Sequence, residues 1–508
     1  MKMGVIGVGE AMGSVCVALG DVANEAVDQS GPGGEFVYVD ISSVDRGSKR
    51  IALTRQLPKA EAPSRAKQVL QAGDVLVSMT RPNLNAVALV PRQLSGAIGS
   101  TGFHVLRSKH MKPEFLFYLV QTEEFIRAMC DQVQGALYPA VRPKDIHAFQ
   151  LKLESVSQQT RIVEKLEELL SGLDVGVAEL KAAQRKLARY RQSLLKAAVQ
   201  GDLTANWREQ HPPQETGAQL LIRILAERRT RWEARQLAKF EQQGKTPPKD
   251  WQKKYPEPVR PDIDDLPALP QGWVWATVDQ LAQVGTGVTP LRSRGAYFNG
   301  GTIPWVTSGA LNSEMVVSAS EFVTELALKE CRLEVFPAGS LLIAMYGEGK
   351  TRGKCAEMVI PATINQAIAA VVLEPAALAC KAFVKAFLLH SYQQMREQAS
   401  GGVQPNLNLQ IVKSMPLPLP PLAEQAEITQ VLAGCMAEIK QLHSAVALGL
   451  QQSTAQRQNI LRAAFTGQLV PQNPADEPAS TLLARIRAER AAQGAARKPR
   501  GRKTKEIA

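Results

Sequence analysis

A long-period repeat constrains the fold of this 508-residue chain more than any other feature of the sequence. The segment QSLLKAAVQGDL, which begins at Gln192, matches QNILRAAFTGQL, which begins at Gln458, 266 positions later. The same shift aligns AGDVLVSM, from Ala72, with AGSLLIAM, from Ala338, and LKLESVSQQTRIVEKL with LPLPPLAEQAEITQVL. Chance similarity would not keep one register across so many patches. The chain therefore consists of two copies of one structural unit.

The first part of each copy is rich in predicted β-strands. Short apolar runs such as FVYVD, from Phe36, DVLVSM, from Asp74, and SLLIAM, from Ser340, are separated by Gly, Pro and Asn turns. Helical stretches follow these runs, for instance PEFLFYLVQTEEFIRAMC from Pro113. We expect an α+β globular domain of about 150 residues in each copy, close to the usual size of one domain.

The second part of each copy is a predicted long helix in which apolar residues recur every seven positions. The helix at 157–199 would be roughly 65 Å long at ~1.5 Å per residue. Each apolar stripe is too narrow to be buried by its own helix, so the two helices are expected to pair as an intramolecular coiled coil. The alternative is a long amphipathic helix that packs on a globular core. The residues of the expected seam are Leu166, Leu173, Leu180, Leu187, Leu194, Leu432, Ile439, Val446 and Ile460.

These patterns divide the chain into six segments. The segment between the copies combines a charged helical run with the proline-rich YPEPVRPDIDDLPALP, and the basic C-terminal end is expected to be disordered. The expected segments are a first globular domain at 1–155, a first long helix at 156–203, a helical and Pro-rich linker at 204–270, a second globular domain at 271–421, a second long helix at 422–468, and a short helix with a basic tail at 469–508.

Composition excludes several classes of protein. The net charge of +12 comes partly from the basic tail, and it permits a polyanionic partner without requiring one. The six cysteines are scattered without paired metal-ligand spacing, which favours free thiols in a reducing compartment. No stretch approaches 18 uncharged apolar residues, and Glu10 interrupts the apolar N-terminus, so we expect neither a membrane span nor a signal peptide. The sequence therefore predicts a cytoplasmic protein.

Two glycine-rich motifs offer an alternative interpretation, a P-loop ATP-binding or dinucleotide-dependent enzyme. LLIAMYGEGKT, from Leu341, ends in Gly-Lys-Thr, but a β-branched run follows where a P-loop needs a helix, and VLVSMTRPNLNAV in the first copy lacks these residues. GVIGVGEAMG, from Gly4, has its third glycine displaced to Gly13. No hydrolase or metal motif is present, and the six histidines are isolated in sequence. We therefore expect no catalytic residue and no metal site.

The loops that follow equivalent strands carry a positive signal. Arg and Lys suit contacts to phosphate and guanine, and Asn and Gln suit contacts to adenine. Two different polar loops on equivalent strands fit a protein that reads two different DNA half-sites, although a solvated polar turn is the alternative for any single residue. The candidate DNA-binding residues are Arg81, Asn83, Asn85, Tyr346, Lys350, Arg352, Lys354, Asn365 and Gln366.

Several segments resemble the specificity (S, HsdS) subunit of type I restriction-modification systems. They are GWVWATVDQLAQVGTGVTP, IPWVTSGALN, AGSLLIAMYG, QPNLNLQIVKSMPLPLPPLAEQAEI and ILRAAFTGQLVPQ, and the likeness is densest over 272–472. The resemblance implies two target recognition domains joined by two long antiparallel helices that pair with each other. One polypeptide would then read a bipartite, asymmetric site on double-stranded DNA.

The same resemblance implies a division of labour among subunits. The chain would have no active site and no cofactor of its own. It would dock two methyltransferase subunits, which use S-adenosylmethionine to methylate adenine, and nuclease and translocase subunits, which use ATP and magnesium.

Overall fold

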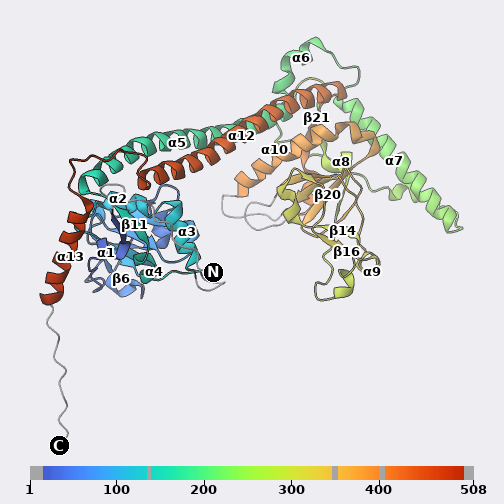
Figure 1. Cartoon of the computed structure of the whole chain (residues 1–508). Helices are drawn as coiled ribbons and strands as arrows, with labels where there is room; N and C mark the ends of the chain where they lie inside the picture. Colours follow the sequence, from blue (N-terminus) through green and yellow to red (C-terminus); the bar gives the residue numbers. More distant parts are fainter. Residues whose placement is uncertain (1–14, 134–138, 346–352, 400–406, 497–508) are drawn as a thin grey trace, which may run out of the picture. The chain divides into compact units, whose positions relative to one another are not determined.

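The computed structural model describes residues 15–133, 139–345, 353–399 and 407–496 (Figure 1). The chain forms two compact units, one built from Met1–Lys181 with Ala447–Ala508 and the other from Ala182–Val446. We call them unit 1 and unit 2. The basic end of the chain, from residue 497 onward, lies outside the described residues.

Unit 1 contains short strands in several small sheets. The first strand of the unit pairs with the last one, and the strands between them form a four-stranded sheet, a three-stranded sheet and a two-stranded hairpin of β3 (Val44–Asp45) and β4 (Arg50–Ile51). In sheet order these strands are β1 (Val15–Ala18) and β11 (Gln150–Leu153); β5 (Arg55–Leu57), β2 (Phe36–Val39), β9 (Ile98–Ser100) and β6 (Ala66–Val69); and β10 (Phe103–Leu106), β7 (Val75–Ser78) and β8 (Val87–Leu89). The helices that cover them are α1 (Leu19–Val22), α2 (Pro113–Leu119), α3 (Glu123–Asp131) and α4 (Pro143–His147).

Unit 2 repeats this plan with a larger central sheet. Its strands, in sheet order, are β12 (Val274–Thr277) and β21 (Pro416–Leu419); β13 (Ala282–Thr286), β20 (Ile368–Leu373), β17 (Leu341–Ala344), β18 (Cys355–Met358) and β15 (Met315–Val316); and β16 (Glu321–Val323), β14 (Ile303–Val306) and β19 (Thr363–Ile364). Its shorter helices are α6 (Ala205–Gln210), α8 (Val278–Leu281), α9 (Glu325–Glu330), α10 (Lys381–Ala399) and α11 (Leu409–Ser414).

The repeat is visible in how the strands pair within each unit. β1 and β11 are antiparallel with Val15 opposite Leu153, and β12 and β21 are antiparallel with Val274 opposite Leu419. β2 runs parallel to β9 as β14 runs parallel to β19. β7 and β17 each lie between two antiparallel neighbours. The two copies of the sequence therefore share these strand pairings, and each unit adds further strands of its own.

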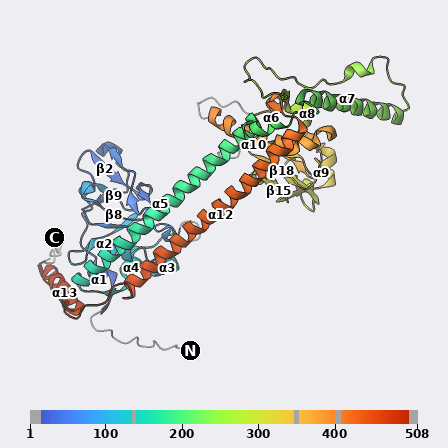
Figure 2. The same cartoon turned by 90° about the horizontal axis from the view of Figure 1, so that it is seen from above.

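Two long helices, α5 (Val156–Gln200) and α12 (Leu422–Phe465), pack together and run antiparallel (Figure 2). In unit 1 the side chain of Leu180 packs closely on Gly449: a Cβ atom added to Gly449 would lie 3.2 Å from Leu180 Cδ1. In unit 2 Leu194, Leu432 and Ile439 belong to one buried core cluster. The expected α+β class with paired long helices is confirmed.

The remaining residues of the expected seam are buried to different degrees. Leu166 is fully buried, whereas the others are half-buried, namely Leu173, Leu180, Leu187, Val446 and Ile460. Burial is thus greatest toward the ends of the two helices, where the sheets also pack on them.

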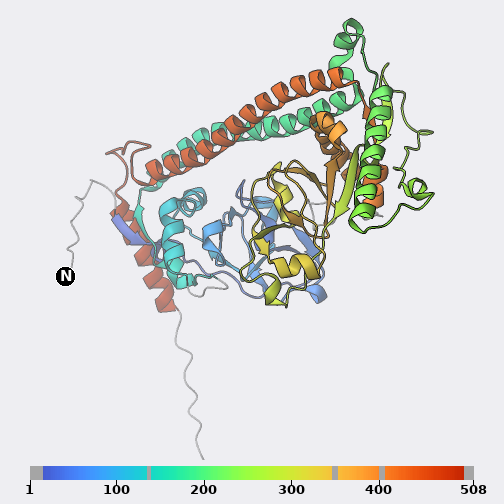
Figure 3. The ribbon, with the colours of Figure 1, turned by 90° about the vertical axis from the view of Figure 1, so that its right-hand side faces the viewer.

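A shorter helix packs on each unit after a long helix has ended. These helices are α7 (Gly217–Gln242) in unit 2 and α13 (Ala479–Ala496) in unit 1 (Figure 3). Leu220 of α7 and Leu482 of α13 are buried. Arg228 of α7 donates a hydrogen bond to the backbone oxygen of Asp279, and Arg490 of α13 donates one to that of Gly20, at 3.0 Å. Both acceptors belong to the short helix that follows the first strand of their unit, α8 and α1. The C-terminal helix therefore completes unit 1 as α7 completes unit 2.

The proline-rich segment before β12 is attached to unit 2 instead of extending freely. The Val259 amide donates to the carboxylate of Asp279 at 3.0 Å, and the Thr277 hydroxyl donates to the Val259 oxygen at 2.7 Å. Trp251 stacks on Trp232 of α7. Over the residues that the structure describes, none of the helices has both the length and the apolar character that crossing a membrane requires.

Two histidines that are isolated in sequence contact each other in the folded chain. His104 of β10 and His147 of α4 place their Nε2 atoms 2.9 Å apart. Burial, and then the neighbouring His147, lower the pKa of His104 to about 4. Burial, and then the charge of Arg490, lower the pKa of His147. Such a hydrogen bond needs one ring nitrogen without a proton.

This pair predicts an acid-sensitive unit 1. Both folded-state pKa values lie below the ordinary value of 6.5, so the unfolded chain binds more protons, and the free energy of unfolding falls as pH decreases from about 6.5 toward 4. His104→Met should remove about 2 kcal/mol of this pH dependence, measured by denaturant unfolding between pH 7.5 and pH 4.5. His443→Gln, at an exposed position of α12, is the control. Identical pH profiles for His104→Met and wild type would contradict the assignment.

Candidate nucleic-acid interface

The first candidate loop, residues 80–85, follows β7 in unit 1. Arg81 has left-handed backbone geometry with φ of 49°, and its amide donates to the Pro139 oxygen at 2.8 Å. A 3-10 turn over Pro82–Leu84 follows it. Non-glycine residues adopt this conformation only where surrounding contacts fix it. The loop thus has a defined shape, and it leaves Arg81 and Asn83 exposed.

Asn85 is different, because its side chain is bound inside the protein. It is only 8% exposed, and its Nδ2 donates to the Val120 oxygen at 2.8 Å. Lys49 Nζ donates to both Asn85 Oδ1, at 3.0 Å, and the Asn85 backbone oxygen, at 2.6 Å. The amide that the sequence assigns to DNA therefore anchors the loop instead, and we do not retain Asn85 as a DNA contact.

The second candidate loop follows β17 in unit 2. Tyr346, Lys350 and Arg352 lie outside the described residues. Lys354 is half-buried and donates to Asn312 Oδ1 at 2.6 Å. Its backbone oxygen accepts from the Ala344 amide at 3.0 Å, which places it beside the end of β17.

Asn365 and Gln366 lie in the turn between β19 and β20. Asn365 Oδ1 accepts from the Ala367 amide at 3.2 Å, so its side chain shapes the turn, whereas Gln366 is exposed. The Met345 amide donates to the Ala367 oxygen at 2.7 Å. This bond joins the turn to the end of β17 at one end of the five-stranded sheet, where Lys354 also lies, so Lys354 and Gln366 are in the same region.

The structure contradicts both nucleotide-binding interpretations. The chain leaves β17 and returns as β18, an antiparallel strand that begins at Cys355, so no helix follows the Gly-Lys-Thr. Glycines 4, 7, 9 and 13 lie outside the described residues, but the strand after them, β1, is antiparallel to β11 instead of opening a parallel sheet. Asp40, the acidic residue at the end of β2, caps a 3-10 turn and pairs with Arg55 at 2.6 Å.

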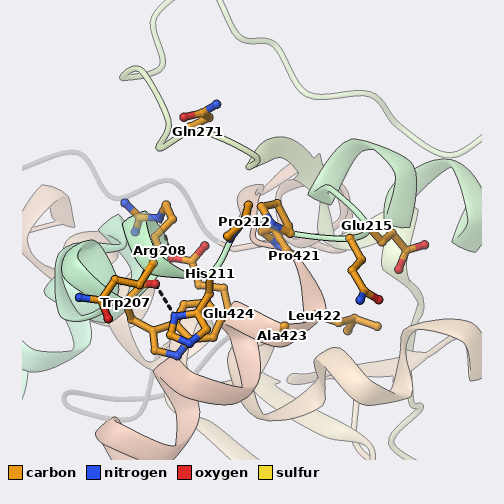
Figure 4. A pocket seen from close by; sticks show the side chains of 13 residues that line it. Trp207, Arg208, His211, Pro212, Glu215, Gln271, Pro421, Leu422, Ala423 and Glu424 are labelled. Carbon is orange, nitrogen blue, oxygen red and sulfur yellow. Dashed lines mark hydrogen bonds and ion pairs between the residues drawn. The ribbon is translucent and has the colours of Figure 1, made fainter.

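A pocket of about 550 Å³ lies in unit 2, between α6 and the start of α12 (Figure 4). Trp207 and His211 stack on one side of it, with ring centroids 4.4 Å apart. Glu424, which is 2% exposed, accepts hydrogen bonds from Arg208 Nε, Thr204 Oγ1 and Trp273 Nε1, each at 2.8 Å. The carboxylate is thus bound by internal partners, and it joins the segment that follows α5 to the start of α12.

Sequence reasoning missed Glu424, although a signal existed. The equivalent residue of the first copy is Gln158, 266 positions earlier, whose Nε2 donates to the Val470 oxygen at 3.2 Å. A buried polar side chain thus occupies the same helix start in both copies. Within the described ranges no group of three or more His, Cys, Asp or Glu side chains is placed to hold a metal ion.

Comparison with known proteins assigns the chain to a family. Residues 270–445 match the model of the type I restriction modification DNA specificity domain. The chain is 26% identical over 400 residues to the type I restriction enzyme EcoDI specificity subunit of Escherichia coli, a match that covers 77% of this chain and 80% of that one. It is 27% identical over 172 residues to the MjaIX specificity subunit of Methanocaldococcus jannaschii, covering 33% and 39% of the two chains.

The fold agrees with these matches. A chain in a solved type I restriction-modification system is similar over 90% of this chain and 99% of its own length, with a TM-score of 0.63 at 23% identity. The chain belongs to the specificity subunits of type I restriction-modification systems.

A specificity subunit is the DNA-recognition component of its complex and not a catalytic one. The expected absence of an active site is confirmed by this membership, and the alternative of a nucleotide-dependent enzyme is wrong. Cofactors belong to the methyltransferase and restriction subunits, and the specificity subunit takes part in a complex with DNA.

The buried glutamate predicts a large loss of stability when it is removed. Glu424→Ala should lower the free energy of unfolding by about 3–5 kcal/mol, because the partly buried Arg208 and the Trp273 indole lose their acceptor. Glu438→Ala, at an exposed position on the same helix, should change it by less than about 0.5 kcal/mol. Equal effects of the two substitutions in denaturant unfolding would show that the Glu424 network does not support the fold.

Proposed function

We propose that this specificity subunit reads a bipartite, asymmetric DNA site with two target recognition domains, residues 1–155 and 271–421. One observation carries the proposal. The two units share the pairings of their main strands, but the loops that follow β7 and β17 differ in sequence. Equal scaffolds with unequal loops suit two half-sites of different sequence.

Base contacts are proposed for a small set of side chains. Arg81 and Asn83 are exposed on a loop whose backbone is fixed, which suits recognition of a base edge in the major groove. Gln366 and Lys354 are proposed for the second half-site, together with Tyr346, Lys350 and Arg352. Asn365 is proposed to act through the turn that it shapes and not by direct contact.

The long helices are proposed to set the distance between the half-sites. α5 has 45 residues and α12 has 44, and each would measure roughly 65 Å at ~1.5 Å per residue. Segments 156–203 and 422–468 would then act as the spacer, while 204–270 and 469–508 carry the helices that complete the two units. The apolar residues that recur every seven positions, from Leu166 to Ile460, are proposed as the seam between the two helices.

The repeat also supports the proposed partners. Two copies of one unit offer two similar surfaces, which suits two copies of a methyltransferase subunit. These subunits would use S-adenosylmethionine to methylate adenine, and restriction subunits would use ATP and magnesium to translocate and cut DNA. Because the substrate is cellular DNA, we propose that the complex is cytoplasmic.

Arg81 tests the proposal. In the complex with its methyltransferase subunits, Arg81→Ala should relax base preference in one half-site at a cost of about 1–3 kcal/mol and leave the other half-site unchanged. Selection of bound duplexes from a randomised pool measures both halves at once. Lys59→Ala, another exposed cation of the same domain, should leave both halves intact. A loss of preference in both half-sites, or in neither, would contradict the assignment of one domain to one half-site.

A further inference from the structure

A small basic hairpin lies next to the first candidate loop. After β2 the chain forms the two-residue strands β3 (Val44–Asp45) and β4 (Arg50–Ile51). The Asp45 carboxylate accepts the Gly47 amide at 2.7 Å, so it shapes the turn. Arg46 and Arg50 are exposed, and neither makes an ion pair with any residue that the structure describes.

Lys49 joins this hairpin to the loop that carries Arg81. Its ammonium donates both hydrogen bonds to Asn85 described above, and Asn85 closes that loop. Lys49 is half-buried and also has left-handed geometry, with φ of 57°. The hairpin and the loop therefore form one continuous surface, held by contacts that are 36 residues apart in sequence.

The positive charges at this surface are close enough to affect one another. Burial, followed by the charges of Arg457 and Arg46, lowers the pKa of Lys49 to about 8, and the opposing effect of Asp45 is smaller. Arg457 of α12 is itself paired with Asp174 of α5. Cations gathered in this way disfavour one another, and a bound anion would relieve the repulsion.

Unit 2 contains a corresponding tie between the same two elements. Lys354, which lies between β17 and β18, donates to Asn312, which lies in the segment after β14, at 2.6 Å. The lysine and asparagine have exchanged places relative to Lys49 and Asn85, but they connect equivalent segments. Arg191 of α5 precedes Arg457 by the repeat distance of 266, and it pairs with Glu314 of the same segment. In both copies, a lysine–asparagine hydrogen bond thus connects the segment after β2 or β14 to the segment after β7 or β17. Its presence in both copies, despite different sequences, indicates that the two segments form one surface.

We propose that the β3–β4 hairpin is a second DNA-contacting element of the first recognition domain, in which Arg46 and Arg50 bind backbone phosphates. Lys49 is a positioning residue that fixes the hairpin against the loop carrying Arg81. This inference rests on the proposed function and adds to it. Phosphate contacts set the position of a reader on the duplex, and base contacts then specify the sequence. Arg46 and Arg50, which have no ion pair among the described residues, lie beside the base-reading loop and supply such contacts.

The salt dependence of DNA binding tests the hairpin. Each phosphate contact contributes about 0.9 to the slope of log K against log salt concentration, so Arg46→Ala/Arg50→Ala should reduce the slope by about 2. The measurement uses the full chain in complex with its methyltransferase subunits and a duplex that contains the selected site. Base preference in both half-sites should stay as in wild type.

Lys59→Ala/Arg92→Ala is the matched control, because it removes the same charge from exposed positions of the same domain. β5 is antiparallel to β2, so Lys59 lies at the end of β2 away from the hairpin. Arg92 follows β8, whereas the loop at 80–85 precedes it. An equal slope change in the two double variants, or none in Arg46→Ala/Arg50→Ala, would overturn the proposal. A wild-type complex without any preferred duplex would contradict the proposed function, while the comparison of slopes would still decide whether the hairpin binds phosphate.

A second variant tests the positioning role. Lys49→Met keeps both arginines and removes the tie to Asn85, so it should lower discrimination in the first half-site roughly tenfold and leave the second half-site unchanged. Lys49→Arg should restore part of this discrimination. A variant that melts at a lower temperature but retains full discrimination would show that Lys49 serves the fold alone.

Discussion

The pairing of two apolar stripes supports the rest of this molecule. Neither α5 nor α12 can bury its own apolar stripe. Each stripe is removed from water only when it packs against a second helix whose apolar residues also recur every seven positions. In unit 1 this pairing brings Leu180 against Gly449, and in unit 2 it joins Leu194 to Leu432 within one core. Because each helix begins in one unit and ends in the other, both cores depend on the same pair of helices.

Each core is then completed by a helix that follows a long helix in sequence. Arg228 and Arg490 donate to equivalent carbonyl oxygens, and Leu220 and Leu482 fill equivalent apolar sites. The helix near the C-terminus is therefore part of the first unit and not an appendage. Because α7 completes unit 2 and α13 completes unit 1, the two similar halves of the chain form two complete units. The exposed loops of these units can then differ in sequence.

The sequence predicted the features that depend on periodicity. The repeat, the heptads and the α+β class follow from regular spacing, and the family follows from several motifs together. Individual side chains were harder to place, because their partners are distant in sequence. Asn85 looks like a base reader until Lys49 and Val120 are seen to bind it. Glu424 looks like an ordinary helix residue until Arg208 and Trp273 meet it. Tyr346, Lys350 and Arg352 remain predictions.

One polypeptide that reads two unequal half-sites should direct methylation to a bipartite motif on cellular DNA. Mapping adenine methylation in cells that contain the methyltransferase partner, with and without this chain, measures this. We expect one modified motif that appears only with the chain and consists of two different short sequences separated by a spacer of fixed length. A continuous motif, a motif with two identical halves, or methylation that does not depend on this chain would contradict this expectation.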